Sequence, residues 1–371
     1  MPDRIVVLGA GGLSLGFFGP ELSDQYSLTF LDINLKADLI ERIQESHAYT
    51  TNLAGKAIEP IRVTGVDAFL TDDPAQDAAI RQHVSEAQIF FTAVGIRNLD
   101  TAMGYLAERL QGREDSLYVL CAENGEDVTE AWRRKTAENL HILDTVMGRM
   151  CRLEENPLPD YTPVEADLDW AVVGEAFYGM PVMEDYHNPE VFHSDTFQFV
   201  PEAEFHARDR IKLFAHNGLH CFIAIQGRLR GAERFSDMAG EPDVEGAARA
   251  LLDEEVAPAL WKECGPHVDE TYLKEYFARL PGRLLSGTLR DQVGRGVRGL
   301  VDKFAPNERI IGGLNLLLRN GVRPKRFVDF IADGLRVVRA DAGEAEVETI
   351  LAHIQDEDIR GRVKERYTSG A

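Results

Sequence analysis

The first half of the chain alternates short, nearly continuous apolar runs with stretches of helical periodicity. Four of these runs predict buried strands: Arg4–Leu8, Ser27–Leu31, Gln88–Val94 and Ser116–Cys121. Strands that alternate with helices are typical of βαβ units, in which neighbouring strands run parallel. We therefore predict an α/β fold with a mostly parallel sheet in this half of the chain.

The pattern changes class near residue 200. Two more strand-like stretches, Trp170–Phe177 and Thr196–Val200, precede this point, and beyond it almost every segment is helix-periodic. The longest predicted helices are Phe205–Gly227, Val244–Glu263, Ile310–Arg319 and Phe327–Arg336. The change predicts two domains, an α/β domain over residues 1–200 and a mainly α-helical domain over residues 201–371. Residues 47–67 break into short β-like pieces and suggest an inserted hairpin, whose role the sequence does not reveal.

Composition narrows the range of partners and compartments. The formal net charge of −22 repels polyanions, so nucleic acid and anionic membranes are poor partners. No run of about 18 apolar residues predicts a membrane span, and the first apolar run is shorter than that of a signal peptide. The four cysteines are widely spaced and suggest neither disulfides nor a thiolate metal site. We expect a cytoplasmic monomer or small homo-oligomer.

A glycine-rich turn directly follows the first predicted strand. It contains Gly9, Gly11 and Gly16, with Ser14 in the third position of the usual G-x-G-x-x-G motif. Glycines here let the backbone turn tightly and approach a pyrophosphate at a helix N-terminus. Asp32 closes the second strand about 20 residues later, where a carboxylate binds a ribose diol and repels a 2′-phosphate. The order predicts a Rossmann-like domain that binds NAD rather than NADP, although the same residues could merely build turns.

A further cofactor contact is predicted at Thr92, Val94 and Gly95, where another strand ends. Ligands of doubly wound folds bind at the carboxyl edge of the sheet, on which these residues should lie. Taken alone, the segment fits an ordinary strand end equally well.

The most informative segment is a predicted helix between residues 209 and 220. Five hydrogen-bonding side chains share one arc of its helical wheel: Asp209, Lys212, His216, Asn217 and His220. The apolar side chains occupy the opposite side and would anchor the helix in its domain. Solvated helix faces consist mainly of Glu, Lys and Arg, whereas Asn and His are poor helix formers. The composition of the arc therefore favours a catalytic face over a surface helix, which stays the alternative.

These groups suit the oxidation of an alcohol. Loss of a hydride requires that the hydroxyl proton be removed and that the alkoxide-like oxygen meet preplaced donors. Lys212 can act as the base only if burial lowers its pKa from about 10.4 toward about 7 to 8. The Asn217 amide can donate to the oxygen without titrating. A metal site at His216 and His220 is a second alternative, but it lacks the Glu of H-E-x-x-H and an obvious third ligand, so we expect no metal.

Five motifs together resemble the polyol-specific long-chain dehydrogenases. They are G-A-G-x-x-x-x-G-F-x-G from Gly9 to Gly19, F-x-D-x-N with Phe30, Asp32 and Asn34, T-A-V-G from Thr92 to Gly95, E-N at Glu123 and Asn124, and K-x-x-x-x-N-x-x-H with Lys212, Asn217 and His220. The resemblance covers nearly the whole chain, and the lysine motif is its most specific part. It implies an NAD-dependent, metal-independent oxidoreductase that acts on a polyol or a polyol phosphate.

The resemblance also assigns roles to individual residues. It implies that Lys212 is the general base, that Asn124 and Asn217 hold the oxyanion, that His220 orients the substrate hydroxyl, and that Asp209 relays protons. The implied cofactor contacts are Gly9, Gly11, Ser14, Gly16, Asp32, Asn34, Thr92, Val94, Gly95 and Glu123. Asn124 depends on the resemblance most, because from its position alone it would be a turn residue.

Two departures from the family pattern concern the substrate. His216 stands where the family usually has an apolar residue, and Gly148 replaces an acid that commonly precedes the arginine at position 149. A phosphate site could come from a local basic cluster, because guanidinium groups match phosphate geometry. Its members are Arg290, Arg295, Arg298 and Lys303. A solvated basic helix with ordinary ion pairs is the alternative.

Three other functions stay open on the sequence. The chain could be a free-polyol or sugar-acid dehydrogenase of the same family. Lys212 followed by Asn217-Gly218 also resembles the β-hydroxyacid dehydrogenases, such as 6-phosphogluconate dehydrogenase, but His220 and Glu123-Asn124 favour the polyol family. A non-enzymatic NAD-binding sensor could keep the fold without turnover.

Overall fold

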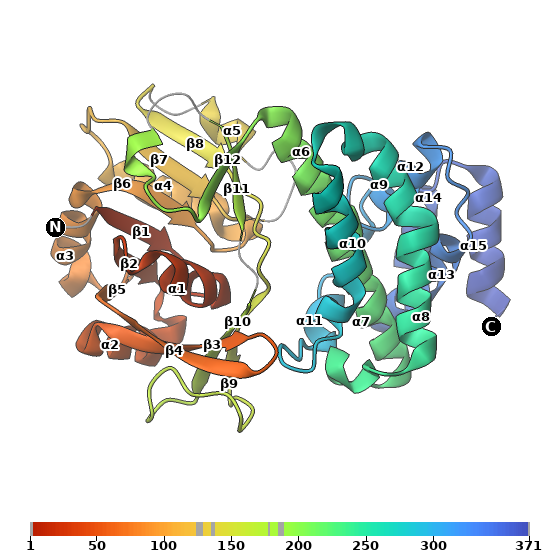
Figure 1. Cartoon of the computed structure of the whole chain (residues 1–371), viewed down its shortest axis with the longest axis horizontal. Coiled ribbons are helices and arrows are strands. Elements are labelled where there is room, and N and C mark those ends of the chain that lie inside the picture. The colour runs from red at the N-terminus through yellow and green to blue at the C-terminus, as the bar shows by residue number, and fades with distance from the viewer. Residues whose placement is uncertain (1–2, 124–128, 135–137, 177–178, 185–188, 370–371) are drawn as a thin grey trace. The chain divides into compact units, whose positions relative to one another are not determined.

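The structure is a computed structural model that describes residues 3–123, 129–134, 138–176, 179–184 and 189–369. Its internal contacts divide the chain into two compact units, Met1–Phe205 and His206–Ala371, which follow each other along the chain in Figure 1. The division falls within helix α6 (Glu202–Ile211), five residues beyond the boundary that the sequence suggested.

The first unit is built on a six-stranded sheet in the order β5-β2-β1-β6-β7-β8. Its strands are β1 (Arg4–Leu8), β2 (Ser27–Asp32), β5 (Val66–Leu70), β6 (Ala87–Thr92), β7 (Leu117–Cys121) and β8 (Leu140–Asp144). Every pairing in it is parallel. Ile5 and Val7 enter one core and Val6 and Leu8 enter the other. Because both faces are covered, each strand has a continuous apolar sequence, and the predicted α/β class is confirmed.

Short helices connect the strands of this sheet and appear around it in Figure 1. They are α1 (Gly19–Leu22), α2 (Ala37–Ser46), α3 (Asp77–Glu86), α4 (Leu99–Arg109) and α5 (Glu130–Arg133). A π-helical turn, Ser14–Phe18, precedes α1. The sequence predicted β1, β2, β6 and β7 but missed β8 and β5. Strand β5 follows the inserted hairpin after a turn at Gly65 with φ of 70°.

The insertion at residues 47–67 does form an antiparallel hairpin, and the structure shows what it does. Its strands belong to a second sheet in the order β4-β3-β10-β9. These strands are β3 (Ala48–Ala54), β4 (Ile58–Thr64), β9 (Cys151–Glu155) and β10 (Trp170–Glu175). The Tyr49 hydroxyl donates to the carbonyl of Leu15 at 2.8 Å, so this sheet supports the helix that follows the glycine-rich turn. A further parallel pair joins β11 (Met180–Met183) to β12 (Phe197–Val200).

The strand order places a topological switch between β1 and β6. The chain leaves β1 toward β2 and β5 on one side and returns to β6, β7 and β8 on the other. Ligands of doubly wound sheets bind at the carboxyl ends of the two strands that flank such a point. Here those ends lead into Gly9 and Ala93, and the Ala93 N–H donates to the carbonyl of Leu8 at 2.8 Å.

The second unit is helical, as predicted. Its helices after α6 are α7 (Gly218–Arg230), α8 (Pro242–Leu251), α9 (Ala257–Cys264), α10 (Glu270–Leu284), α11 (Val293–Val297), α12 (Ile311–Arg319), α13 (Arg326–Ala342), α14 (Glu344–Ala352) and α15 (Glu357–Ser369). Helix α13 packs against α7, α14 and α15, as Figure 1 shows. No helix among the described residues is both long and apolar enough to cross a membrane.

Candidate functional site

The glycine-rich turn has the conformation that its sequence requires. Gly9 has φ of 98°, and a Cβ added there would lie 2.5 Å from the backbone oxygen of Ala93. Only glycine therefore allows β1 and β6 to end so close together. A Cβ at Gly11 would meet no atom within 4 Å, so the backbone there is open to an approaching ligand. The Ser14 hydroxyl donates to the carbonyl of Gly9 and closes the turn.

The later glycines of the turn serve packing within the first unit. A Cβ at Gly12 would lie 2.7 Å from the backbone of Arg152, and one at Gly16 would lie 3.2 Å from the side chain of Val172. Both contacts are with the second sheet. Gly16 thus holds this helix close to β9 and β10, and its predicted contact with the cofactor stays a prediction.

Asp32 lies at the end of β2, where the sequence placed it, but it already has several partners. Its Oδ2 accepts from the Ala10 N–H at 2.8 Å, and its Oδ1 accepts from the Ile33 N–H at 2.8 Å. The Lys36 ammonium also forms an ion pair with Oδ2. Lys36 was not predicted as a partner of Asp32 from the sequence. The neighbouring Asn34 is exposed, and its backbone N–H donates to Asp72 at 3.2 Å.

The end of β6 is held by a half-buried carboxylate. Oε1 of Glu123 accepts from the Val94 N–H at 2.9 Å, beside Gly95 with φ of 83°. Burial raises the pKa of Glu123, while the backbone N–H groups of Val94 and Gly95 lower it. Thr92 is fully buried in the strand. Glu123 thus fixes the shape of this loop, whereas Asn124 lies outside the described residues.

The predicted catalytic helix contains a π-helical turn that the sequence did not reveal. The turn spans Lys212–Asn217, and the Gly218 N–H donates to the carbonyl of Leu213, five residues earlier. A regular α-helical wheel places Asn217 about 140° from Lys212, but this wheel does not apply to the π turn. The wider turn reduces the angle between residues five apart, and π turns are frequent at functional sites.

Lys212 has the altered acidity that a base requires. Burial lowers its pKa to about 8, with Asp209 raising the pKa and Arg309 lowering it. Asp209 lies three residues earlier on α6, as the sequence indicated. Arg309 was not predicted: it comes from the segment before α12, and its carbonyl faces Gly218 at the start of α7.

His220 is bound to an aspartate that the sequence analysis also missed. Its Nε2 lies 2.8 Å from Oδ2 of Asp291, and the Asp291 side chain is only 1% exposed. The other oxygen of this carboxylate accepts from the Gln292 N–H at 2.9 Å and forms an ion pair with Nε of Arg295 at 3.2 Å. Burial lowers the pKa of His220, and Asp291 opposes that effect. Asp291 therefore orients a neutral imidazole at neutral pH.

His216 is also buried. Its ring stacks on that of His220 with centroids 6.5 Å apart and 9° between the ring planes. Burial brings the pKa of His216 well below its usual value, and the positive charge of Arg283 adds to this effect. His216 is thus a neutral packing partner of His220, not a member of an exposed polar arc. Within the described residues, no three His, Cys, Asp or Glu side chains are grouped so that they could hold a metal ion.

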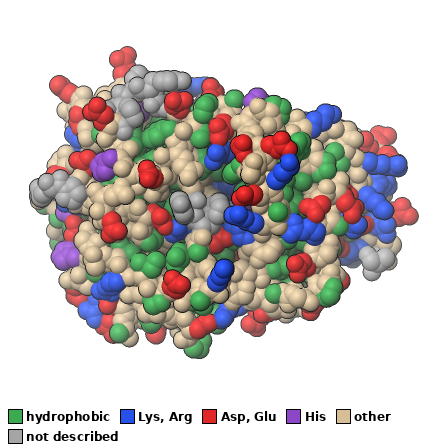
Figure 2. All heavy atoms as spheres, viewed as in Figure 1, with side chains coloured by type: hydrophobic (Ala, Val, Ile, Leu, Met, Phe, Trp, Pro, Cys, Tyr) green, Lys and Arg blue, Asp and Glu red, His purple; other side chains and the backbone are tan. Residues whose placement is uncertain are grey.

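The four members of the proposed phosphate cluster lie in different surroundings. Arg295 and Lys303 are near enough to lower the pKa of His220, and the Lys303 ammonium donates to the carbonyl of Gly296. Arg290 instead donates through Nε to the Gly287 carbonyl at 2.7 Å. Arg298 is exposed. Figure 2 shows basic and acidic side chains interspersed over the visible face, so attraction of a phosphate depends on such local groups.

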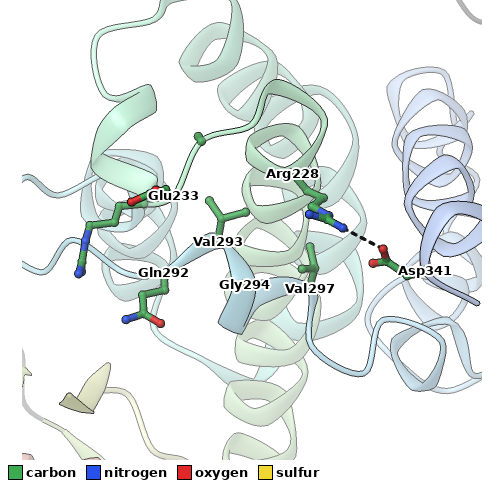
Figure 3. Close-up of a pocket in the computed structure, with 9 residues that line it drawn as sticks. Arg228, Glu233, Gln292, Val293, Gly294, Val297 and Asp341 are labelled. Atoms are coloured by element: carbon green, nitrogen blue, oxygen red, sulfur yellow. Dashed lines mark hydrogen bonds and ion pairs between the residues drawn. The ribbon is translucent and has the colours of Figure 1, made fainter. Parts of the chain in front are cut away.

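A separate cavity of about 450 Å³ opens at the amino end of α11. Figure 3 shows Gln292 and Val293 on one side of it and the ion pair between Arg228 and Asp341, 2.9 Å long, on the other. None of Lys212, Asn217 and His220 lines this cavity. It begins one residue after Asp291 and is therefore a neighbour of the histidine pair, not the predicted site.

Together these features define a class of protein. A doubly wound α/β unit carries a glycine turn and an aspartate in the positions used for dinucleotides, and a helical unit carries lysine, asparagine and histidine on one helix. The family model "Mannitol dehydrogenase Rossmann domain" matches residues 3–145, and "Mannitol dehydrogenase C-terminal domain" matches residues 205–366. The chain belongs to the mannitol dehydrogenase family, which confirms the resemblance to polyol-specific dehydrogenases.

Individual relatives agree with this assignment. Several of the similar proteins are named mannitol-1-phosphate 5-dehydrogenase. The proteins of that name from Lacticaseibacillus casei and Emericella nidulans are 24% and 25% identical to this chain. The alignments cover 97% and 98% of this chain, and 94% of each relative.

Solved structures show the same fold. Mannitol 2-dehydrogenase from Pseudomonas fluorescens, in a ternary complex with NAD and D-mannitol, matches with a TM-score of 0.76 and 15% identity, covering 100% of this chain and 92% of that one. A D-sorbitol dehydrogenase in substrate-free form matches with a TM-score of 0.72 and 13% identity, covering 99% and 93%.

Proposed function

We propose that this protein catalyses the NAD-dependent oxidation of a secondary hydroxyl of a sugar-alcohol phosphate, and the reverse reduction of a ketose phosphate. Mannitol 1-phosphate and fructose 6-phosphate, or close relatives, are the proposed pair. The observation that carries the proposal is Lys212, whose pKa burial lowers to about 8, on the same side of its helix as Asn217. Family membership supports the polyol class over the β-hydroxyacid alternative.

The first unit fits a dinucleotide. The open backbone at Gly11 allows close approach of a pyrophosphate, and Asp32 at the end of β2 is placed to accept from a ribose diol. When bound, NAD supplies the hydride acceptor. Glu123 holds the β6 loop through Val94, and that loop borders the same switch point of the sheet.

In the second unit, each proposed role follows from a local arrangement. The neutral amine of Lys212 takes the proton of the substrate hydroxyl, and the Asn217 amide donates to the oxygen as negative charge develops on it. Neutral His220, held by Asp291, positions the hydroxyl. Asp209 exchanges protons with Lys212. We keep Asn124 as the second oxyanion donor on the resemblance alone, and no step in this scheme requires a metal.

The pH dependence of the reaction tests the lysine base. Because the neutral amine is the active base, kcat/KM for polyol oxidation should rise with pH and level off above a pKa of about 8. Ketose reduction needs the ammonium as the acid, so its kcat/KM should fall over the same range. Asp209→Asn should move both midpoints to lower pH, since Asp209 raises the pKa of Lys212. Steady-state rates between pH 6 and about 10 measure both midpoints. Midpoints that are the same in Asp209→Asn and in the wild-type enzyme would contradict the scheme.

The preference between a phosphorylated and a free ketose tests the proposed phosphate site. We expect kcat/KM for fructose 6-phosphate to exceed that for free fructose by at least about tenfold, because charge-assisted hydrogen bonds to a phosphate are strong. Arg295→Gln and Lys303→Gln should remove most of this difference, whereas Arg298→Gln, at an exposed position, should change it little. Equal kcat/KM for both ketoses in the wild-type enzyme would favour a free-polyol or sugar-acid dehydrogenase. No turnover of any ketose or sugar acid would favour the NAD-binding sensor.

A further inference from the structure

The cofactor carboxylate of this chain has a built-in cationic partner. The Lys36 ammonium forms an ion pair with Oδ2 of Asp32 and donates to the carbonyl of Ala10 at 3.2 Å. Both side chains are largely shielded, with exposed fractions of 21% for Lys36 and 12% for Asp32. Lys36 ends a short 3₁₀ turn, Asn34–Lys36, directly after β2. The ammonium therefore lies between the glycine-rich turn and the residue that selects the coenzyme.

This ion pair changes the electrostatic basis of coenzyme choice. An isolated carboxylate at the end of the second strand excludes NADP because it repels the 2′-phosphate, and a cationic side chain nearby accommodates that phosphate. Here Lys36 offsets the charge of Asp32, and its ammonium carries three donors on a flexible stem. It could leave Oδ2 and bind a phosphate without any movement of the backbone.

Two further groups limit the effect. Asp72 contacts the backbone of Asn34 at 3.2 Å and keeps negative charge near the same edge. Asp32 also retains the N–H groups of Ala10 and Ile33 when Lys36 moves away, so its carboxylate stays in place. These groups favour NAD over NADP even where the Lys36 ammonium binds a 2′-phosphate.

We propose that Lys36 makes this unit a dual-coenzyme site, in which the ammonium stays on Asp32 when a 2′-hydroxyl is bound and transfers to the phosphate when NADP is bound. Only the kinetic test of this inference rests on the proposed function, because the binding test needs no turnover. It adds NADP(H) to the coenzymes of the chain and assigns the preference to the pair formed by Asp32 and Lys36.

Kinetics with both coenzymes test the pair. Lys36→Met should lower kcat/KM for NADPH relative to NADH by at least about tenfold, the worth of one charge-assisted hydrogen bond. Asp32→Ser should raise the same ratio by at least about tenfold, and the double variant should lose most of that gain because the ammonium is gone. Lys56→Met, which removes an exposed lysine from the β3–β4 turn, is the matched control and should leave the ratio unchanged.

The ratio of kcat/KM for NADPH to that for NADH distinguishes a role of Lys36 in phosphate recognition from a purely structural role. Loss of the Lys36 bond to Ala10 would loosen the glycine-rich turn and weaken both coenzymes alike, so it cannot move the ratio. A double variant that keeps the full gain of Asp32→Ser, or an unchanged ratio in Lys36→Met, would overturn the proposal.

Binding of coenzyme fragments provides a test that does not depend on turnover. By calorimetry, 2′,5′-ADP should bind the wild-type chain, and Lys36→Met should weaken its affinity by at least about tenfold while affecting 5′-AMP much less. If 5′-AMP binds and 2′,5′-ADP does not, the dual-coenzyme site is wrong while the proposed NAD enzyme stands. If both fragments bind as expected but no polyol or ketose reacts, the proposed function fails and the coenzyme site stands.

Discussion

Lys212→Ala should reduce kcat by at least about two orders of magnitude, because general base catalysis by a positioned side chain contributes about 10² to 10⁴. Affinity for NADH should change little, since the residues that fit the dinucleotide belong to the other unit. The effect is expected at every pH, because alanine leaves no titrating group to recover at high pH.

Two variants sharpen this experiment. Lys212→Arg keeps the positive charge but cannot release a proton at working pH, so it should be nearly as inactive as alanine. Lys274→Ala removes an exposed lysine that pairs with Glu270 along α10 and should retain full activity. Added primary amines should partly restore Lys212→Ala by supplying the missing base. Substantial activity of Lys212→Arg without such rescue would remove proton transfer by Lys212 from the mechanism.

The sequence predicted the fold well wherever burial alone shapes the pattern. Strands such as β1 and β6 are covered on both faces and therefore have unbroken apolar sequences. By contrast, β9 (CRLEE) carries charged residues, among them the buried pair Arg152 and Glu154 at 2.8 Å. No periodicity distinguishes such a strand from a loop. Strand β9 was missed for this reason, whereas β10 and the hairpin of the same sheet were predicted.

The candidate site was predicted in its motif residues and not in their partners. Lys212, Asn217 and His220 carry a recognisable spacing, but Asp291 and Lys36 act through contacts that depend on tertiary folding. Asp291 lies 71 residues from His220 along the chain, so no local pattern could pair them. Lys36 is four residues from Asp32, and this spacing near the end of β2 was a signal that could have been used.

The π turn explains a second limit of sequence reasoning. Its five-residue hydrogen bond inserts one extra residue per turn, but the apolar residues that follow continue with ordinary helical spacing. A wheel drawn for a regular helix therefore accumulates error across the turn, and the angle it gives between Lys212 and Asn217 does not hold. The spacing K-x-x-x-x-N itself, with two functional residues five apart, is the trace that such a turn leaves in a sequence.

Asp291→Asn should lower kcat/KM by at least about tenfold, though by less than the roughly 10⁴-fold loss found where a carboxylate orients a histidine that itself transfers the proton. Asparagine can still accept from His220, but it no longer carries the charge that favours one orientation of the ring and that pairs with Arg295. The loss should appear with polyol and ketose alike, since both must be positioned by His220, and the KM for NADH should stay unchanged.

Stability must be separated from positioning here, because Asp291 is buried and Asn leaves Arg295 without its charged partner. Asp291→Glu keeps the charge and should recover part of the activity, whereas Asp341→Asn, at the exposed end of the Arg228 ion pair, should behave like the wild-type enzyme. Thermal unfolding of each variant shows whether it is folded under assay conditions. A folded Asp291→Asn enzyme with unchanged kcat/KM would mean that His220 needs no orienting carboxylate, and that the stack on His216 is enough to hold its ring.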